Sequence, residues 1–117
     1  MTYVQGFVAA VPAANKQAYI EHARAASKLF LEWGAIRCVE NWGDDVPKGE
    51  TTDFYRSVLA KDDEVVVFSW VEYPDKAACD RVSEKMMSDP EMAKMEMPFD
   101  GARMIYAGFE TLFVMEK

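Results

Sequence analysis

The chain has 117 residues, half of them hydrophobic, and 20 acidic residues against 13 basic ones give a net charge of −7. This length and composition predict a single domain over residues 1–117 and exclude a disordered chain. The acidic balance disfavours nucleic acid and anionic membrane as partners, because both attract clustered positive charge. No apolar run approaches a membrane span of roughly 20 residues, and the N-terminus lacks signal-peptide features, so we expect a cytoplasmic protein.

The first third of the chain predicts a strand, a helix and a second strand, at residues 3–11, 16–33 and 35–42. The first strand ends at Pro12, which cannot continue a central strand, and Asn15 can cap the helix that follows. In that helix, hydrophobic residues recur every three or four positions, which is the pattern of one buried face. Gly34 is predicted to end the helix, because glycine readily adopts a left-handed conformation.

The third predicted strand, residues 64–73, is the most informative segment because it is apolar on both faces. Val67 and Val71 lie on one face of it, and Phe68 and Trp70 lie on the other. Two long helices suffice to cover only one face of a small sheet, so the second face predicts a partner. That partner is most simply a second copy of the chain. The pattern does not decide which face meets the helices.

The remaining elements complete a recognisable order. Residues 53–60 fit either a short helix or an edge strand. Asp75 can cap a second long helix over residues 76–87, and Pro90 suits the first turn of another short helix. The last strand is predicted over residues 103–115. The order strand, helix, strand, strand, helix, strand predicts an α+β fold, the ferredoxin-like βαββαβ arrangement with a four-stranded antiparallel sheet.

Five motifs, spread in order along nearly the whole chain, carry a family resemblance. They read YVQGFV, WGDDVP, TDF, VVFSW and MPFDGARMIY. Through them the chain resembles the YbaA-like family of uncharacterised bacterial proteins. The resemblance implies a dimeric α/β barrel, in which two ferredoxin-like subunits pair their sheets, and it implies no known activity. The wider superfamily resembles cofactor-independent monooxygenases, haem-degrading enzymes and isomerases, but likeness of fold alone is a weak guide to function.

Residue types suggest several candidate functional residues. His22 is the only histidine and could act as a general acid or base, with half-buried packing as the alternative. Arg103 could hold an anionic ligand, or it could pair with Asp100 in a structural turn. Three further residues are predicted to line a small-molecule site: Asn41, Trp70 and Tyr106. Packing at a dimer interface is the alternative for the aromatic residues.

The chain carries no recognisable motif for catalysis or for binding a metal or phosphate. Zinc spacing, a calcium loop, a glycine-rich phosphate loop and a catalytic triad are all missing from the sequence, so no metal or cofactor is predicted. The methionine cluster within residues 86–97 predicts adaptable packing, with a mobile lid as the alternative. We therefore expect a homodimeric small-molecule-binding protein or a weak cofactor-independent enzyme. A structural or interaction module without activity is the alternative.

Overall fold

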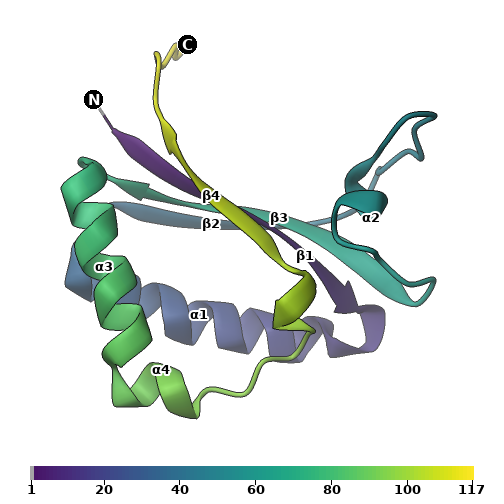
Figure 1. Cartoon of the computed structure of the whole chain (residues 1–117), viewed down its shortest axis with the longest axis horizontal. Helices are drawn as coiled ribbons and strands as arrows, with labels where there is room; N and C mark the ends of the chain where they lie inside the picture. The colour runs from purple at the N-terminus through teal and green to yellow at the C-terminus, as the bar shows by residue number, and fades with distance from the viewer. Residues whose placement is uncertain (1) are drawn as a thin grey trace.

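The computed structural model describes residues 2–117 and centres on one antiparallel sheet of four strands (Figure 1). The strands are β1 (Tyr3–Pro12), β2 (Arg37–Trp42), β3 (Glu64–Tyr73) and β4 (Ile105–Glu110). Their order in the sheet is β2-β3-β1-β4, so the two longest strands lie in the centre. This order, with a helix after β1 and another after β3, confirms the predicted ferredoxin-like fold.

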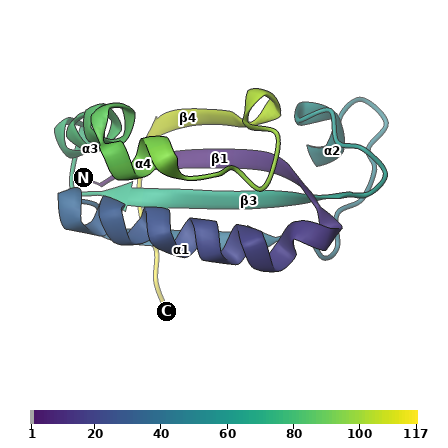
Figure 2. The same ribbon diagram turned by 90° about the horizontal axis from the view of Figure 1, so that it is seen from below.

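Two long helices, α1 (Lys16–Trp33) and α3 (Lys76–Ser88), cover the same face of the sheet (Figure 1, Figure 2). The short helices are α2 (Phe54–Ser57) and α4 (Pro90–Lys94), and single 3₁₀ turns lie at Ala13–Asn15 and Gly101–Arg103. The ambiguous residues 53–60 therefore contain a short helix, which lies against the opposite face of the sheet at one end. Within residues 2–117, no helix combines the length and the apolar character that crossing a membrane requires.

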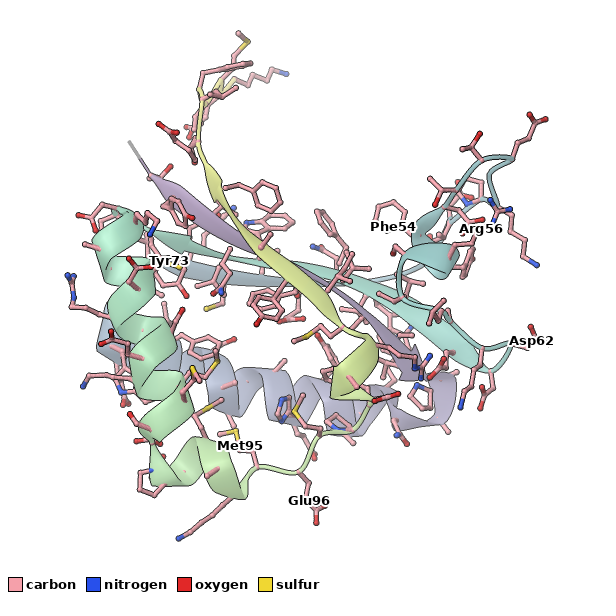
Figure 3. All side chains as sticks on the ribbon, in the orientation of Figure 1. Phe54, Arg56, Asp62, Tyr73, Met95 and Glu96 are labelled. Atoms are coloured by element: carbon pink, nitrogen blue, oxygen red, sulfur yellow. The ribbon has the colours of Figure 1, made fainter. Side chains whose placement is uncertain are left out.

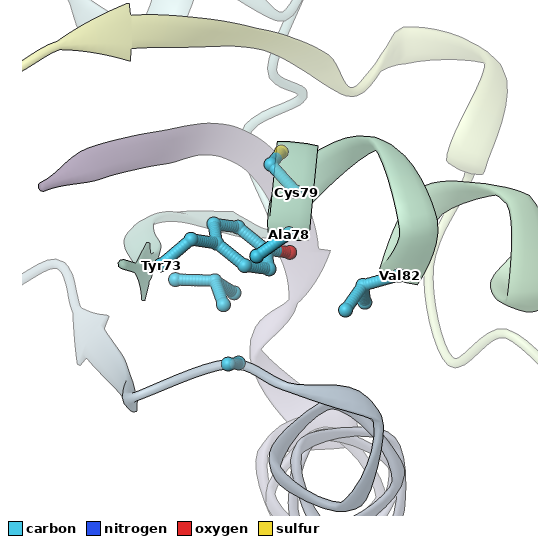
Figure 4. Close-up of a cluster of buried hydrophobic side chains, with 6 residues drawn as sticks. Tyr73, Ala78, Cys79 and Val82 are labelled. Atoms are coloured by element: carbon cyan, nitrogen blue, oxygen red, sulfur yellow. The ribbon is translucent and has the colours of Figure 1, made fainter. Parts of the chain in front are cut away.

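The core lies between the sheet and the two long helices, and it decides which face of β3 is covered. Val67 packs with Val11 and Tyr19 under α1. Nearer α3, two residues of β3 pack against three of the helix: Val71, Tyr73, Ala78, Cys79 and Val82 (Figure 4). The alternate residues Phe68 and Trp70 therefore point to the other face of the sheet, which we call the open face.

Two predicted details of the chain are wrong, each for a local reason. The last strand covers Ile105–Glu110 and not residues 103–115, because Gly101–Arg103 forms a 3₁₀ turn before it and the ladder with β1 ends at the Tyr3–Glu110 pair. Asn15 occupies the cap position of α1, but its side chain does not bond to the helix. Its amide instead donates to the Pro98 carbonyl at 2.8 Å. By contrast, Asp75 caps α3 as predicted, accepting from the backbone N–H of Ala78 at 2.8 Å.

Arg103 fixes the route by which the chain enters β4. Its guanidinium donates to both carboxylate oxygens of Glu64, at 2.8 and 2.6 Å, and to Asp100 at 2.9 Å. It also donates to the Leu59 carbonyl at 2.9 Å. The Glu64 side chain is only 4% exposed, so this two-bond contact is shielded from water. The predicted pairing of Arg103 with Asp100 is confirmed, and Glu64 is a second, more buried partner.

Removing the Glu64 charge should destabilise the fold, because Arg103 would lose its buried counter-ion. We expect Glu64→Gln to lower the free energy of unfolding by about 2 kcal/mol, measured by urea denaturation at fixed protein concentration. The matched control is Asp80→Asn, which breaks the exposed Lys76–Asp80 pair and should cost less than about 0.5 kcal/mol. Equal losses in the two variants would contradict the structural role of Glu64.

The same ion pair predicts how stability depends on pH. The hydrogen bonds from Arg103 lower the pKa of Glu64 from 4.5 to about 2. Because the folded-state pKa is lowered, the stabilisation is complete above the unfolded-state value and is lost as the pH falls toward 2. Urea midpoints of the wild type and Glu64→Gln should therefore converge between about pH 5 and about pH 2. A constant difference across that range would refute the assignment.

Candidate functional site

A cavity of about 220 Å³ lies between α1, the helix-covered face of the sheet and the chain that leads from α3 to β4. Five methionines line it from that connecting chain, which we call the methionine segment (residues 86–104). They are Met86, Met92, Met95, Met97 and Met104. The other lining residues are apolar apart from Tyr19, His22, Ser27, Glu40 and Ser69. A mostly apolar cavity with a few converging polar groups is the usual form of a small-molecule site.

The methionine segment is held over the cavity by hydrogen bonds within it and by one to the residue that precedes α1. Asp89 accepts hydrogen bonds from the backbone N–H groups of Glu91 and Met92. It thereby caps α4, whose first residue is Pro90. Farther along, the Asn15 amide holds the Pro98 carbonyl. Figure 3 shows Met95 between α4 and α1. The segment therefore forms the outer wall of the cavity.

Phe99 joins this wall to the interior of the protein. Its ring lies 5.7 Å from that of Tyr19 and 6.3 Å from that of His22, measured between ring centroids. Burial lowers the pKa of His22, so the imidazole is neutral at physiological pH. His22 also lines a second, more polar pocket on the outer side of the methionine segment. The imidazole therefore lies between the cavity and the surface, where a proton carrier could act.

The polar corner of the cavity is built by Tyr19 of α1, Glu40 of β2 and Ser69 of β3. The Tyr19 hydroxyl donates to Glu40 Oε1 at 2.5 Å, a short bond typical of a carboxylate acceptor. Glu40 stands directly opposite Ser69 in the β2–β3 pairing, so both side chains emerge on the helix-covered face. The sheet register thus brings two strand residues to the hydroxyl of a helix residue.

Burial shifts the protonation of this corner. It raises the pKa of Tyr19, and the negative charge of Glu40 raises it further, so the phenol stays protonated. Burial also raises the pKa of Glu40, although hydrogen bonds from Tyr19 and Ser69 oppose that rise. Glu40 as a whole residue is exposed because β2 is an edge strand, but its carboxyl group lies under Tyr19 at the cavity wall. The corner therefore holds a protonated phenol that donates to a carboxyl group whose pKa is raised by burial.

The candidate residues from the sequence do not gather into one site. His22 lies at the cavity, and Tyr106 stacks on Phe7, one of the lining residues, with ring centroids 6.2 Å apart. Arg103 is engaged by its carboxylate partners at the end of the sheet. Two of the candidates, Asn41 and Trp70, lie on the open face. There the Asn41 amide donates to the Phe68 carbonyl, and the Trp70 indole donates to Glu72.

Tyr19, Glu40 and Ser69 were not singled out from the sequence as site residues. Tyr19 belongs to the hydrophobic stripe of α1, and this position predicts a residue of the hydrophobic core. Ser69 is the informative exception, because it is the one polar residue within the apolar run of β3 and is only 4% exposed. A buried hydroxyl needs a hydrogen-bonding partner, so a serine within an apolar strand indicates a second polar group nearby in the core.

The open face carries aromatic and aliphatic side chains that remain in water in the single chain. Phe68 and Trp70 lie next to each other on β3, with ring centroids 5.7 Å apart, and Phe54 of α2 lies beside Phe68. On β4, Phe109 lies over Gly6 and is 57% exposed. The exposed fraction of Phe68 is 46%. A large apolar face of this kind marks an interaction surface more often than a solvated one.

Comparisons with known proteins agree with this fold. The family model described as "Protein of unknown function (DUF1428)" matches residues 2–101. The uncharacterised protein YbaA of Escherichia coli K12 and that of Shigella flexneri are each 56% identical to this chain over 114 residues. Those alignments cover 96% of this chain and 97% of each relative.

Two solved structures are similar in fold, each with a TM-score of 0.56 over 99% of this chain and 98% of the other. One is a variant of SnoaB, a cofactor-independent oxygenase from Streptomyces nogalater, at 12% identity. The other is a dimeric ferredoxin-like protein from an uncultured marine organism, at 13% identity. At such identities the likeness supports the fold alone. The family match and the close relatives together show that this chain belongs to the DUF1428 family of proteins of unknown function.

Proposed function

We propose that this protein binds a small, mostly apolar molecule in the methionine-lined cavity. The observation that carries the proposal is the convergence of Tyr19, Glu40 and Ser69 on a cavity whose other walls are largely apolar. Protein interiors are otherwise packed with few voids larger than a water molecule. The volume of about 220 Å³ is below the usual range of about 300–1,000 Å³ for ligand pockets, which favours a compact ligand.

Catalysis without a cofactor is a second candidate for the same cavity. Neutral His22 and the carboxyl group of Glu40 both line it, and the pKa of each is shifted by burial. The raised pKa of Glu40 lies closer to neutral pH than that of an exposed carboxyl group, and the lowered pKa of His22 keeps its imidazole neutral and able to accept a proton. The alternative of a purely structural module gives no role to a polar corner that faces an open cavity.

We also propose that the protein is a cytoplasmic homodimer that pairs the open faces of two sheets. In a dimer with a two-fold axis, the open face of one subunit packs against the same face of the other subunit. Exposed Phe68 and Phe109 would then leave water, as their apolar character favours. The dimeric fold neighbour supports this arrangement by analogy. Free Cys38 and Cys79 suit a reducing compartment.

The cavity is testable through its own methionines. Protein carrying carbon-13 methyl-labelled methionine should show shifts of the cavity methyl signals on titration with toluene, a compact apolar probe. Met87, which is 87% exposed, should not shift and serves as an internal reference. Native mass spectrometry of gently purified protein should in addition detect any retained molecule.

A pair of alanines on α1 supplies the matched variants. Ala26 is buried and lines the cavity, so Ala26→Leu should fill it and abolish the toluene shifts. Neighbouring Ala25 is exposed and outside the cavity lining, so Ala25→Leu should leave the shifts intact. No shift in the wild type, together with no retained mass, would remove the binding proposal.

The dimer is testable with a charge placed on the open face. Phe68→Glu should give monomers in size-exclusion chromatography with light scattering, because a carboxylate would be buried without a partner in the paired sheets. Met87→Glu adds the same charge to the exposed surface of α3 and should remain dimeric. A monomeric wild type, or a dimeric Phe68→Glu variant, would rule out pairing through this face.

A further inference from the structure

The geometry points to the chemical class of the ligand: we infer that the cavity selects a neutral aromatic molecule that donates a hydrogen bond to Glu40, such as a small phenol. This inference rests on the proposed function, because it assigns a ligand class to the same cavity. It depends on three features of the walls: their charge, the hydrogen-bonding capacity of Glu40, and the side chains that surround the apolar body of the ligand.

The charge of the walls excludes anionic ligands. Among the residues that the structure describes, neither lysine nor arginine lines the cavity, and its histidine is neutral. Arg24 and Lys28 line a separate groove on the outer side of α1. The wall between that groove and the cavity is formed by four residues that line both: Tyr19, Ala23, Ser27 and Glu40. A carboxylate or phosphate in the cavity would therefore meet Glu40 without a compensating cation, which is costly in an apolar site.

The hydrogen-bonding capacity of Glu40 favours a donor on the ligand. A carboxylate offers about four acceptor positions, and the Tyr19 hydroxyl occupies one of them. Ser69 stands opposite Glu40 in the strand pairing, so its hydroxyl lies on the same side of the sheet. Glu40 therefore has acceptor positions left at the cavity wall. A hydroxyl group of the ligand could donate to one of them and so replace the hydrogen bond that it makes to water in solution.

The remaining walls suit a flat, polarisable body. The five methionines bring thioether sulfur atoms to one side of the cavity, and sulfur contacts aromatic rings favourably. Phe7, Phe30 and Phe99 add aromatic surfaces on other sides. The cavity volume of about 220 Å³ limits the ligand to a compact ring system.

The test compares four probes that share the same ring. They are toluene, p-cresol, p-toluate and p-methylbenzylamine, each titrated into the methyl-labelled wild-type protein at neutral pH. A phenol ionises near pH 10, so p-cresol is neutral there, whereas p-toluate is an anion and p-methylbenzylamine a cation. We expect p-cresol to bind several-fold more tightly than toluene and at least about tenfold more tightly than the anion p-toluate, which Glu40 repels. The ammonium group of p-methylbenzylamine would lose its hydration for a single carboxyl partner, so we expect this cation also to bind more weakly than p-cresol.

A comparison of Glu40 on β2 with Glu21 on α1 separates the role of Glu40 from a general effect of charge. Glu40→Gln keeps the shape of the side chain but removes its charge, so the affinity gap between p-cresol and p-toluate should narrow by at least about fivefold. Glu21→Gln removes a charge from the exposed side of α1, outside the cavity lining, and should leave the gap unchanged. The wild-type comparison decides the inference even if a variant folds poorly.

The outcomes distinguish this inference from the proposed function. If toluene binds, and if p-toluate or p-methylbenzylamine binds as tightly as p-cresol or more tightly, the ligand class is overturned. The cavity then remains a binding site for a molecule of another class. Equal affinities of toluene and p-cresol would overturn the role of Glu40 as an acceptor. If none of the four probes shifts the methionine methyl signals, the ligand class fails, and if native mass spectrometry also detects no retained molecule, the binding proposal fails with it.

Discussion

Both faces of β3 must be shielded from water, and the rest of the structure depends on how each is covered. The face with Val67 and Val71 lies under α1 and α3, which places the core and fixes the positions of both helices. The opposite face, with Phe68 and Trp70, receives only the short α2 at one end. A central strand of this composition therefore fixes both the core of the chain and the apolar surface that the chain exposes.

The cavity is a consequence of covering a four-stranded sheet with two helices. The face of α1 that meets the sheet carries small residues such as Ala23 and Ala26, which leave space that larger side chains would fill. The methionine segment closes that space from outside with flexible side chains that adapt to irregular volumes. The edge position of β2 then brings Glu40 to the same space, so that an apolar interior acquires one carboxyl group.

Local sequence patterns predicted most of the fold and little of the site. The bounds of α1 and β3 followed from hydrophobic periodicity and from Pro, Gly and Asp at their ends, all of which act within a few residues. The end of β4 was missed because it depends on where β1 begins, which is a distant part of the chain. The polar corner was missed for the same reason, since Glu40 meets Ser69 only through the strand register. The Asn15 side chain likewise found a partner 83 residues away.

The sheet and the methionine segment contribute different parts of the structure, and this affects which parts can change independently. All five cavity methionines belong to one stretch of chain, whereas the register of the sheet is set by β1 and β3. Substitutions of those methionines alter the cavity wall, whereas Asp100 and Arg103 of the same stretch hold the chain where it enters β4. The lining of the cavity can therefore change one methionine at a time while the register of the sheet stays the same.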